Sequence, residues 1–178
     1  GAYIPEVRKR NARGTIMTIS VGDRLPEASL LQMGANGAEA VSLGEKLKGR
    51  KVVIFGLPGA FTGTCTTAHV PSFMRVRGKL ADKGVDEVIC LSVNDPFVMK
   101  AWGESTGAAA AGITFLGDAS SEFTKAIGME FSVPHLGFAD RSKRYALYAE
   151  DGVVKVLNMG QESSACEISG GEAMLEAI

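Results

Sequence analysis

The residues best suited to chemistry lie in one short stretch, Pro58-Gly59-Ala60-Phe61-Thr62-Gly63-Thr64-Cys65. The stretch follows an apolar run and precedes a segment with helical spacing, which predicts a strand, a tight loop and a helix that begins near Cys65. The first turn of a helix has N–H groups without intrahelical acceptors and a partial positive charge, and both favour a thiolate over a thiol. We therefore predict that Cys65 is a nucleophile.

The two other cysteines lie in different settings. Three cysteines without a C-x-x-C pair fit neither a disulfide scaffold nor a zinc site, so we expect a reducing compartment and no metal or cofactor. Cys90 lies in an apolar, strand-like run, where a free cysteine is usually core packing. Cys166 lies in a polar loop, residues 161–166, where a thiol would be accessible and movable.

Composition bounds the class of protein. The chain has 178 residues, 46% of them hydrophobic, which fits one globular domain with a sizeable core. Its 19 basic and 20 acidic residues nearly cancel, so no global field favours nucleic acid or an anionic membrane. No apolar run approaches the roughly 20 residues of a membrane span, and no signal peptide is evident. We expect a soluble protein whose partners are small molecules or other proteins.

The amino-terminal residues are basic and irregular. Arg8, Lys9, Arg10 and Arg13 outnumber the acidic residues there, as in a trimmed organellar targeting segment or in a solvated arm. Both interpretations stay open, and the predicted location is cytoplasmic or mitochondrial. We expect residues 1–20 to form a flexible or extended arm and residues 21–178 to form a single domain.

Strand-like and helix-like segments alternate along that domain. Residues 52–56 have no polar alternation, which is typical of a central strand buried on both faces. The other strand-like segments are a hairpin within 25–37, residues 87–93, residues 113–116, and a hairpin of 145–149 with 153–157 around an Asp-Gly turn. The predicted helices are 42–49, from Cys65 to Gly84, from Asp95 to about 106, 120–128 and 171–178.

Two features qualify the helix after Cys65 and the aromatic residues beyond it. Pro71 lies inside the helical pattern and predicts a kink or a local break there. Trp102 has the spacing of a core residue, and we place Phe97 and Met99 with it. The order of elements predicts an α/β, thioredoxin-like fold, with a mixed central sheet flanked by helices and an N-terminal hairpin addition.

Several motifs together resemble one known family. The stretch from Pro58 to Cys65 resembles the P-x-x-x-T-x-x-C active-site motif of peroxiredoxins. Further similarity to the peroxiredoxin-5 and plant type II branch lies in residues 65–71 (CTTAHVP), 91–98 (LSVNDPFV) and 141–145 (RSKRY). The similarity runs from about Gly22 to the C-terminus. One departure is Gly63, where the branch usually has proline, and it affects loop rigidity without removing a reacting group.

The resemblance implies a thiol peroxidase for hydrogen peroxide and small alkyl hydroperoxides. In the family the motif cysteine attacks the O–O bond and becomes a sulfenic acid. Cys65 matches that cysteine, Thr62 the motif threonine, Arg144 the activating arginine, and Pro58 the proline that shields the thiolate. Sequence alone does not choose Arg144 over Arg141 or Lys143, although a place beside a strand start lets it face inward.

The resemblance also bears on reduction and assembly. Cys166 approximately matches the resolving cysteine of the peroxiredoxin-5 branch, and Cys90 matches the second cysteine of the plant type II branch as a weaker candidate. A one-cysteine mechanism with an external thiol is the third possibility. The reductant implied is thioredoxin, glutaredoxin or glutathione. The branch commonly forms homodimers through the active-site ends, where Phe61 would lie.

Ionisation alone does not make a fast peroxidase. A free cysteine with a pKa of about 8.5 is only a few per cent thiolate at neutral pH, so full ionisation gives roughly 30-fold at most. The remainder must come from groups that hold the peroxide in line with sulfur and stabilise charge on the leaving oxygen. Thr62, Arg144 and backbone N–H groups near Cys65 are the predicted donors.

Two other function classes stay open. In a non-enzymatic redox sensor or relay, Cys65 would oxidise once and pass a disulfide to a partner. In a cysteine hydrolase, His69 or His135 would serve as the base. His69 shares a helix face with Cys65, but we expect it to be a structural neighbour, because an arginine keeps a thiolate charged without taking its proton. We place His135 on the surface.

Overall fold

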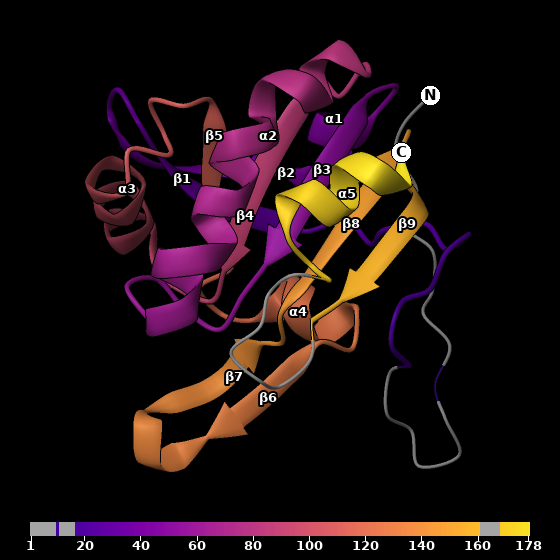
Figure 1. The fold of residues 1–178 in the computed structure, drawn as a ribbon. Coiled ribbons are helices and arrows are strands. Elements are labelled where there is room, and N and C mark those ends of the chain that lie inside the picture. The colour runs from indigo at the N-terminus through magenta and orange to yellow at the C-terminus, as the bar shows by residue number, and fades with distance from the viewer. Residues whose placement is uncertain (1–9, 11–16, 161–167) are drawn as a thin grey trace.

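A computed structural model describes residue 10, residues 17–160 and residues 168–178, and for Cys65 its backbone. Within these residues the centre of the molecule is a seven-stranded mixed sheet in the order β2-β1-β5-β4-β3-β8-β9 (Figure 1). Its strands are β1 Ser29–Gly34, β2 Gly37–Ser42, β3 Lys51–Gly56, β4 Glu87–Ser92, β5 Ile113–Gly117, β8 Tyr145–Glu150 and β9 Val153–Met159. The mixed sheet and the N-terminal hairpin β1–β2 confirm the predicted fold class.

Helices cover both faces of the sheet. The helices are α1 Leu43–Leu47, α2 Val70–Asp82, α3 Pro96–Ser105, α4 Glu122–Ala126 and α5 Gly171–Ala177, with the π-helical turn η1 Cys65–His69 directly before α2. The sheet has an apolar core on each face, and alternate residues of β3 pack into the two cores. Val53 and Phe55 pack with α2, α3 and α5, whereas Val52 and Ile54 pack with α1 and α4. The core is therefore two apolar layers separated by the sheet.

The strand β3 is central and buried, as predicted. It pairs in parallel with β4 and antiparallel with β8, and β4 in turn pairs in parallel with β5. Parallel strands end at one edge of a sheet, so the loops that follow β3, β4 and β5 lie next to one another. That edge receives the stretch from Pro58 to Cys65. Cys90, in β4, has no exposed surface and belongs to the core.

The hairpin β8–β9 brings the segment around Arg144 to the same edge. Its turn residues Asp151 and Gly152 have φ values of 50° and 79°, as the two-residue Asp-Gly turn requires. Tyr145 pairs with Gly56 at the end of β3, and a Cβ atom on Gly56 would overlap the Tyr145 ring. This close approach places residue 144 beside the start of the active loop.

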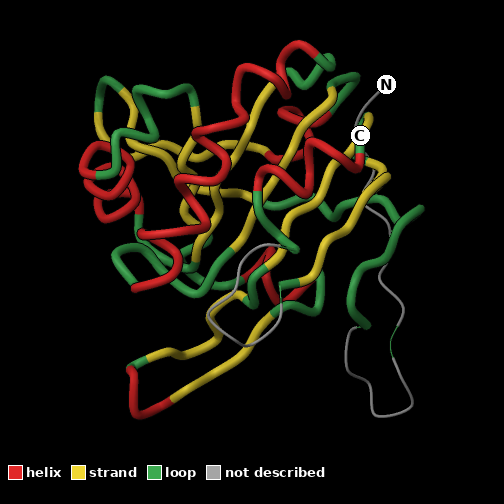
Figure 2. The backbone as a smooth tube through the Cα atoms, viewed as in Figure 1, coloured by secondary structure: helices red, strands yellow, loops and turns green. Residues whose placement is uncertain are grey.

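A second, two-stranded sheet was not predicted. β6 Glu130–Val133 and β7 Phe138–Ser142 form a hairpin that extends away from the main body (Figure 2). A short 3₁₀ turn, η2 Pro134–Leu136, lies at its tip and carries His135, which is exposed as expected. The hairpin leads directly into the segment that contains Arg141 and Arg144.

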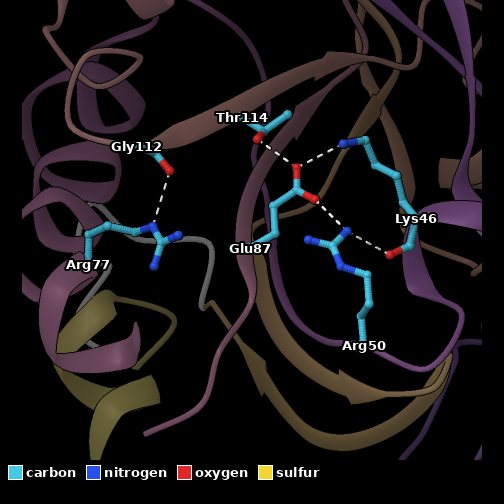
Figure 3. Close-up of polar contacts among 6 residues, drawn as sticks. All are labelled: Lys46, Arg50, Arg77, Glu87, Gly112 and Thr114. Atoms are coloured by element: carbon cyan, nitrogen blue, oxygen red, sulfur yellow. Dashed lines mark hydrogen bonds and ion pairs between the residues drawn. The ribbon is translucent and has the colours of Figure 1, made fainter. Parts of the chain in front are cut away.

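Polar contacts fix the opposite end of the parallel strands. The Glu87 carboxylate accepts hydrogen bonds from Lys46 at 2.9 Å, Arg50 at 2.8 Å and Thr114 at 2.7 Å (Figure 3). Burial alone would raise the pKa of Glu87, but these three donors outweigh it and lower that pKa. In the same view Arg77 of α2 donates to the Gly112 carbonyl. The starts of β4 and β5 are thereby joined to α1 and α2.

The predicted caps of α1 and α3 are confirmed, and the predicted burial of Phe97 is wrong. Ser42 caps α1 and Asp95 caps α3, as the sequence indicates. At the start of α4 the N-cap residue Ser121 has a φ of 61° and makes no side-chain cap bond, and Asp118 instead accepts from the N–H groups of Phe123 and Thr124. Phe97 is 66% exposed instead of buried, since it lies on the outer side of α3; Trp102 is fully buried.

The arm predicted for residues 1–20 falls mainly outside the described residues. Near its end, Ile19 is 1% exposed and its N–H donates to the Ile127 carbonyl. Leu25 is fully buried, and its N–H donates to Gly152. The chain is therefore packed against the core from about residue 19 onward.

Candidate active site

A π-helical turn carries the predicted nucleophile. Helical backbone starts at Gly63, widens into η1 over Cys65–His69, and continues as α2. The break predicted at Pro71 is this change of helix type, and Pro71 itself lies in the first turn of α2, where proline is tolerated. The Thr66 N–H donates to the Thr62 carbonyl at 3.0 Å. The amides of residues 63–65 thus belong to a first turn without intrahelical acceptors.

The active loop before the helix is held in an unusual backbone conformation. Phe61 has a φ of 64°, a region that non-glycine residues rarely adopt. The Thr62 hydroxyl donates to the Gly59 carbonyl at 2.7 Å, and the Ala60 N–H donates to the Asn94 side chain at 3.0 Å. The Thr62 hydroxyl hydrogen is thus taken up by a hydrogen bond within the loop. Toward a ligand, Thr62 offers the lone pairs of its oxygen instead of the proton we predicted.

A second arginine also reaches this loop. Arg141 Nη1 donates to the Pro58 carbonyl at 3.0 Å, and its guanidinium lies 5.0 Å from the centre of the Phe138 ring. A Cβ atom on Gly59 would overlap Arg141 Nη1, so a side chain at position 59 would displace the guanidinium from this position. Arg141 therefore ties the β6–β7 hairpin to the start of the active loop, a role that the sequence analysis missed.

Arg144 meets the helix at His69. Arg144 Nη1 lies 3.0 Å from His69 Nδ1, and the other ring nitrogen, Nε2, lies 2.8 Å from the Ser169 carbonyl oxygen. Arginine only donates and a carbonyl only accepts, so His69 carries its proton on Nε2 and presents a lone pair at Nδ1. Arg144 is half-buried while Lys143 is exposed, as the predicted register requires.

His69 is a neutral side chain inside the protein. It has no exposed surface, and burial, followed by the charge of Arg144, lowers its pKa from 6.5 to about 3, although the Ser169 carbonyl opposes the shift. The one lone pair of the ring, at Nδ1, already accepts a hydrogen bond from Arg144, so it is not available for His69 to act as a base. His135, at the tip of the β6–β7 hairpin, lies on a different element from the active loop.

This buried histidine predicts a pH dependence of stability. Between pH 6.5 and about 3 the unfolded chain binds a proton at His69 that the folded chain does not. The free energy of unfolding should therefore fall as pH decreases through this window, by up to about 1.4 kcal/mol per pH unit from this group. Urea titrations of the wild type and of His69→Asn should show a shallower slope in the variant. His135→Gln, which changes an exposed histidine, should keep the wild-type slope.

The departure at Gly63 predicts a gain in stability. The Thr62 carbonyl accepts the hydrogen bond of Thr66, so Gly63 occupies the first helical position, where proline is favoured. A Cβ atom there would meet no other atom within 4 Å. Gly63→Pro should raise the free energy of unfolding by about 0.4–1 kcal/mol, through the unfolded state. A lower urea midpoint for the variant would contradict this fit.

Two other predicted site residues are Cys90 and Cys166. Cys90 is buried in β4, and Cys166 lies outside the described residues. Among the residues that the structure describes, no group of three or more His, Cys, Asp or Glu side chains is placed to hold a metal ion. Within the same residues, no helix has the length and apolarity that crossing a membrane requires.

Comparison with known proteins identifies the family. The model of the Redoxin family matches residues 20–175. Peroxiredoxin-2E-2, chloroplastic, from Oryza sativa subsp. japonica is 46% identical over 94% of this chain and 76% of its own length. Peroxiredoxin-2F, mitochondrial, from Arabidopsis thaliana is 40% identical over 94% and 84%.

A solved structure agrees with the sequence matches. The crystal structure of reduced Prx3 in complex with H2O2 from Vibrio vulnificus superposes with a TM-score of 0.85 at 41% identity, covering 90% of this chain and 99% of that one. Fold, motifs and relatives therefore coincide: the chain belongs to the redoxin family and is a peroxiredoxin of the plant type II and peroxiredoxin-5 branch, a thiol-dependent peroxidase.

Proposed function

We propose that the protein reduces hydrogen peroxide and small alkyl hydroperoxides with Cys65 as the peroxidatic residue. The thiolate attacks the terminal peroxide oxygen, an S–O bond forms and the O–O bond breaks. The sulfur is oxidised by two electrons to a sulfenic acid, and the alkoxide or hydroxide takes a proton and leaves as alcohol or water. The observation that carries the proposal is the meeting of three elements, the active loop, the helix start and Arg144, at one edge of the sheet.

The assigned partners have distinct roles. Arg144 supplies a fixed positive charge at the helix start, where it stabilises the thiolate and the charge that develops on the leaving oxygen. The Thr62 hydroxyl donates a hydrogen bond to the Gly59 carbonyl, so its oxygen accepts a hydrogen bond from the peroxide O–H. Pro58, held through its carbonyl by Arg141, shields the thiolate and stiffens the loop.

The direct test is turnover followed by peptide mapping. Hydrogen peroxide should be consumed catalytically when a thiol reductant is supplied, whereas a sensor or relay would consume it once per chain. Hydrolysis of esters by the wild type, with a histidine limb in its pH–rate profile, would favour the hydrolase instead. After one equivalent of peroxide without reductant, a linked Cys65–Cys166 peptide supports resolution by Cys166. A sulfenic acid on Cys65 alone, which becomes a glutathione adduct once glutathione is added, supports an external thiol and refutes that pairing.

Reduction returns the enzyme to its starting state. A thiol condenses with the sulfenic acid to form a disulfide and water, and a second thiol then releases the Cys65 thiol. We propose thioredoxin, glutaredoxin or glutathione as the final reductant. Cys90 is the weaker resolving candidate, because its complete burial in β4 would require unfolding of a core strand. Comparing turnover with each reductant in turn distinguishes them.

We also propose a homodimer that packs the active-site ends together. Phe61 is 55% exposed and Phe97 66% exposed, and the bond from Ala60 to Asn94 joins their two segments. Exposed apolar side chains that gather in one patch mark interaction surfaces, and we take Phe61 and Phe97 as parts of one such patch. Sedimentation equilibrium should show a dimer for the wild type. The dissociation constant of the dimer should be higher for Phe97→Ser. A wild type that stays monomeric at high concentration contradicts the proposal.

The location remains a prediction of a cytoplasmic or mitochondrial protein. The two relatives described above are named chloroplastic and mitochondrial, which supports an organelle, as does the basic composition of residues 8–13. Imaging of the full-length chain with a carboxyl-terminal tag distinguishes these locations.

A further inference from the structure

A chain of hydrogen bonds connects Arg144 to the start of the C-terminal helix. Arg144 donates to His69 Nδ1 at 3.0 Å, and His69 Nε2 donates to the Ser169 carbonyl at 2.8 Å. His69 and Ser169 are both fully buried. The three residues come from the segment before β8, from η1 and from the segment before α5. These residues are far apart in the sequence, and the fold brings them into direct contact.

The His69 imidazole packs against two aromatic rings, and both of its nitrogens are hydrogen-bonded. Its ring centre lies 5.1 Å from that of Phe55 and 5.7 Å from that of Phe73, and these two rings stack on each other at 4.2 Å. Packing thus fixes the plane of the ring, and Ser169 fixes which nitrogen carries the proton. The lone pair of Nδ1 then has one direction, toward Arg144. A neutral acceptor of this kind orients a guanidinium without cancelling its charge, as a carboxylate would.

The C-terminal helix is docked next to this contact. The Ser72 hydroxyl donates to the His69 carbonyl at 2.6 Å and accepts from the Gly171 N–H at 2.9 Å. A Cβ atom on Gly171 would overlap the Ser72 carbonyl oxygen, so the start of α5 rests directly on the first turn of α2. The position of the Ser169 carbonyl is consequently set by the docking of α5.

We propose that His69 is the positioning residue for Arg144, and that the Ser169 carbonyl, held by the docked C-terminal helix, fixes the tautomer through which it acts. The proposal rests on the proposed function, because it takes Arg144 as the activating arginine. It makes the C-terminal helix part of the apparatus that forms the peroxide site. His69 itself touches no reacting atom and transfers no proton.

The first test observes the wild-type protein directly. Long-range ¹H–¹⁵N NMR of the two histidines, assigned with His135→Gln, should show His69 as the neutral tautomer with its proton on Nε2. The signal should not change between mildly acidic and mildly alkaline pH. A proton on Nδ1, or a cationic ring at neutral pH, overturns the proposal without requiring any variant of His69.

The second test uses a matched pair of variants. His69→Asn keeps an acceptor oxygen near the position of Nδ1, whereas His69→Leu has a similar shape and no acceptor. The rate constant of the reduced enzyme with hydrogen peroxide should fall about tenfold to hundredfold in His69→Leu, as expected for a misplaced catalytic group, and recover most of that loss in His69→Asn. Circular dichroism checks that each variant is folded. Equal rates in the two folded variants overturn the proposal.

A third variant separates the helix from the histidine. Gly171→Ala should push the start of α5 from Ser72 and lower the rate several-fold in the wild-type background. In the His69→Asn background the same change should have little effect, because asparagine does not depend on the Ser169 carbonyl. Equal effects in both backgrounds contradict a path through His69.

Two controls distinguish this proposal from the proposed function. If the wild type does not turn over peroxide, or if Arg144→Gln reacts as fast as the wild type, the assignment of Arg144 has failed. If Arg144→Gln is impaired while folded His69→Leu reacts like the wild type, the proposed function stands and the positioning role of His69 fails.

Discussion

Cys65→Ser is expected to abolish peroxide turnover. The hydroxyl of serine is un-ionised at neutral pH and is a poor nucleophile toward an O–O bond, so no covalent intermediate forms. The substitution replaces one sulfur atom with oxygen and should leave the fold intact. Peroxide consumption measured with a saturating thiol reductant should fall to the rate of the reductant alone.

The matched control is Cys90→Ala. It removes the thiol that is buried in β4, and turnover should stay near the wild-type value once the variant is folded. A sulfenic-acid probe should label the wild type and Cys90→Ala but not Cys65→Ser. Labelling that persists in Cys65→Ser would move the peroxidatic role to another cysteine.

Arg144→Gln is expected to lower the rate with hydrogen peroxide by about 100-fold or more, the effect of removing one preorganised donor from a site of developing charge. Glutamine keeps hydrogen-bonding capacity but has no charge to stabilise the thiolate or the leaving oxygen. The measurement is the second-order rate constant of the reduced enzyme by stopped flow. Ultraviolet absorbance should show a smaller ionised fraction of Cys65 at neutral pH.

Lys143→Gln controls for the loss of charge. It removes the same formal charge one residue away, from an exposed side chain, and should leave the rate near the wild-type value. Comparable losses of rate in the two variants would mean that the overall positive charge of the segment matters, and not a specific contact of Arg144 with the site. A normal rate in Arg144→Gln would mean that the arginine is wrongly assigned, with Arg141 the next candidate.

The parts of the fold that the sequence predicts are those with strong local patterns. The apolar runs of β3 and β4 indicate central strands because parallel strands are buried on both faces. The Asp151-Gly152 turn identifies the β8–β9 hairpin by its φ requirement. The β6–β7 hairpin has no such signal, since its strands are short and partly exposed, and a 3₁₀ turn that contains Pro134 joins them.

The site was predicted through its motif, and its contacts were not. The sequence indicates Cys65 from the start of a helix, and the family resemblance adds Thr62 and Arg144. The bond between Arg144 and His69 joins residues 75 positions apart, and no local pattern encodes such a contact. The available signals were the helical spacing of His69 from Cys65 and the inward register of Arg144. Joining them needs the pairing of β3 with β8.

The π-helical turn makes the site sensitive to chain length. A π turn accommodates one residue more than the α-helical turn it replaces. Deleting one residue from Cys65–His69 would restore an α-helical turn, and the residues on either side would keep about the same orientation, because the π turn takes up the extra residue within itself. The change would fall on the widened turn itself, which carries both Cys65 and His69. An alignment with a sequence that has an ordinary α-helical turn here therefore needs a one-residue gap within Cys65–His69, and an ungapped alignment would misplace the nucleophile relative to His69.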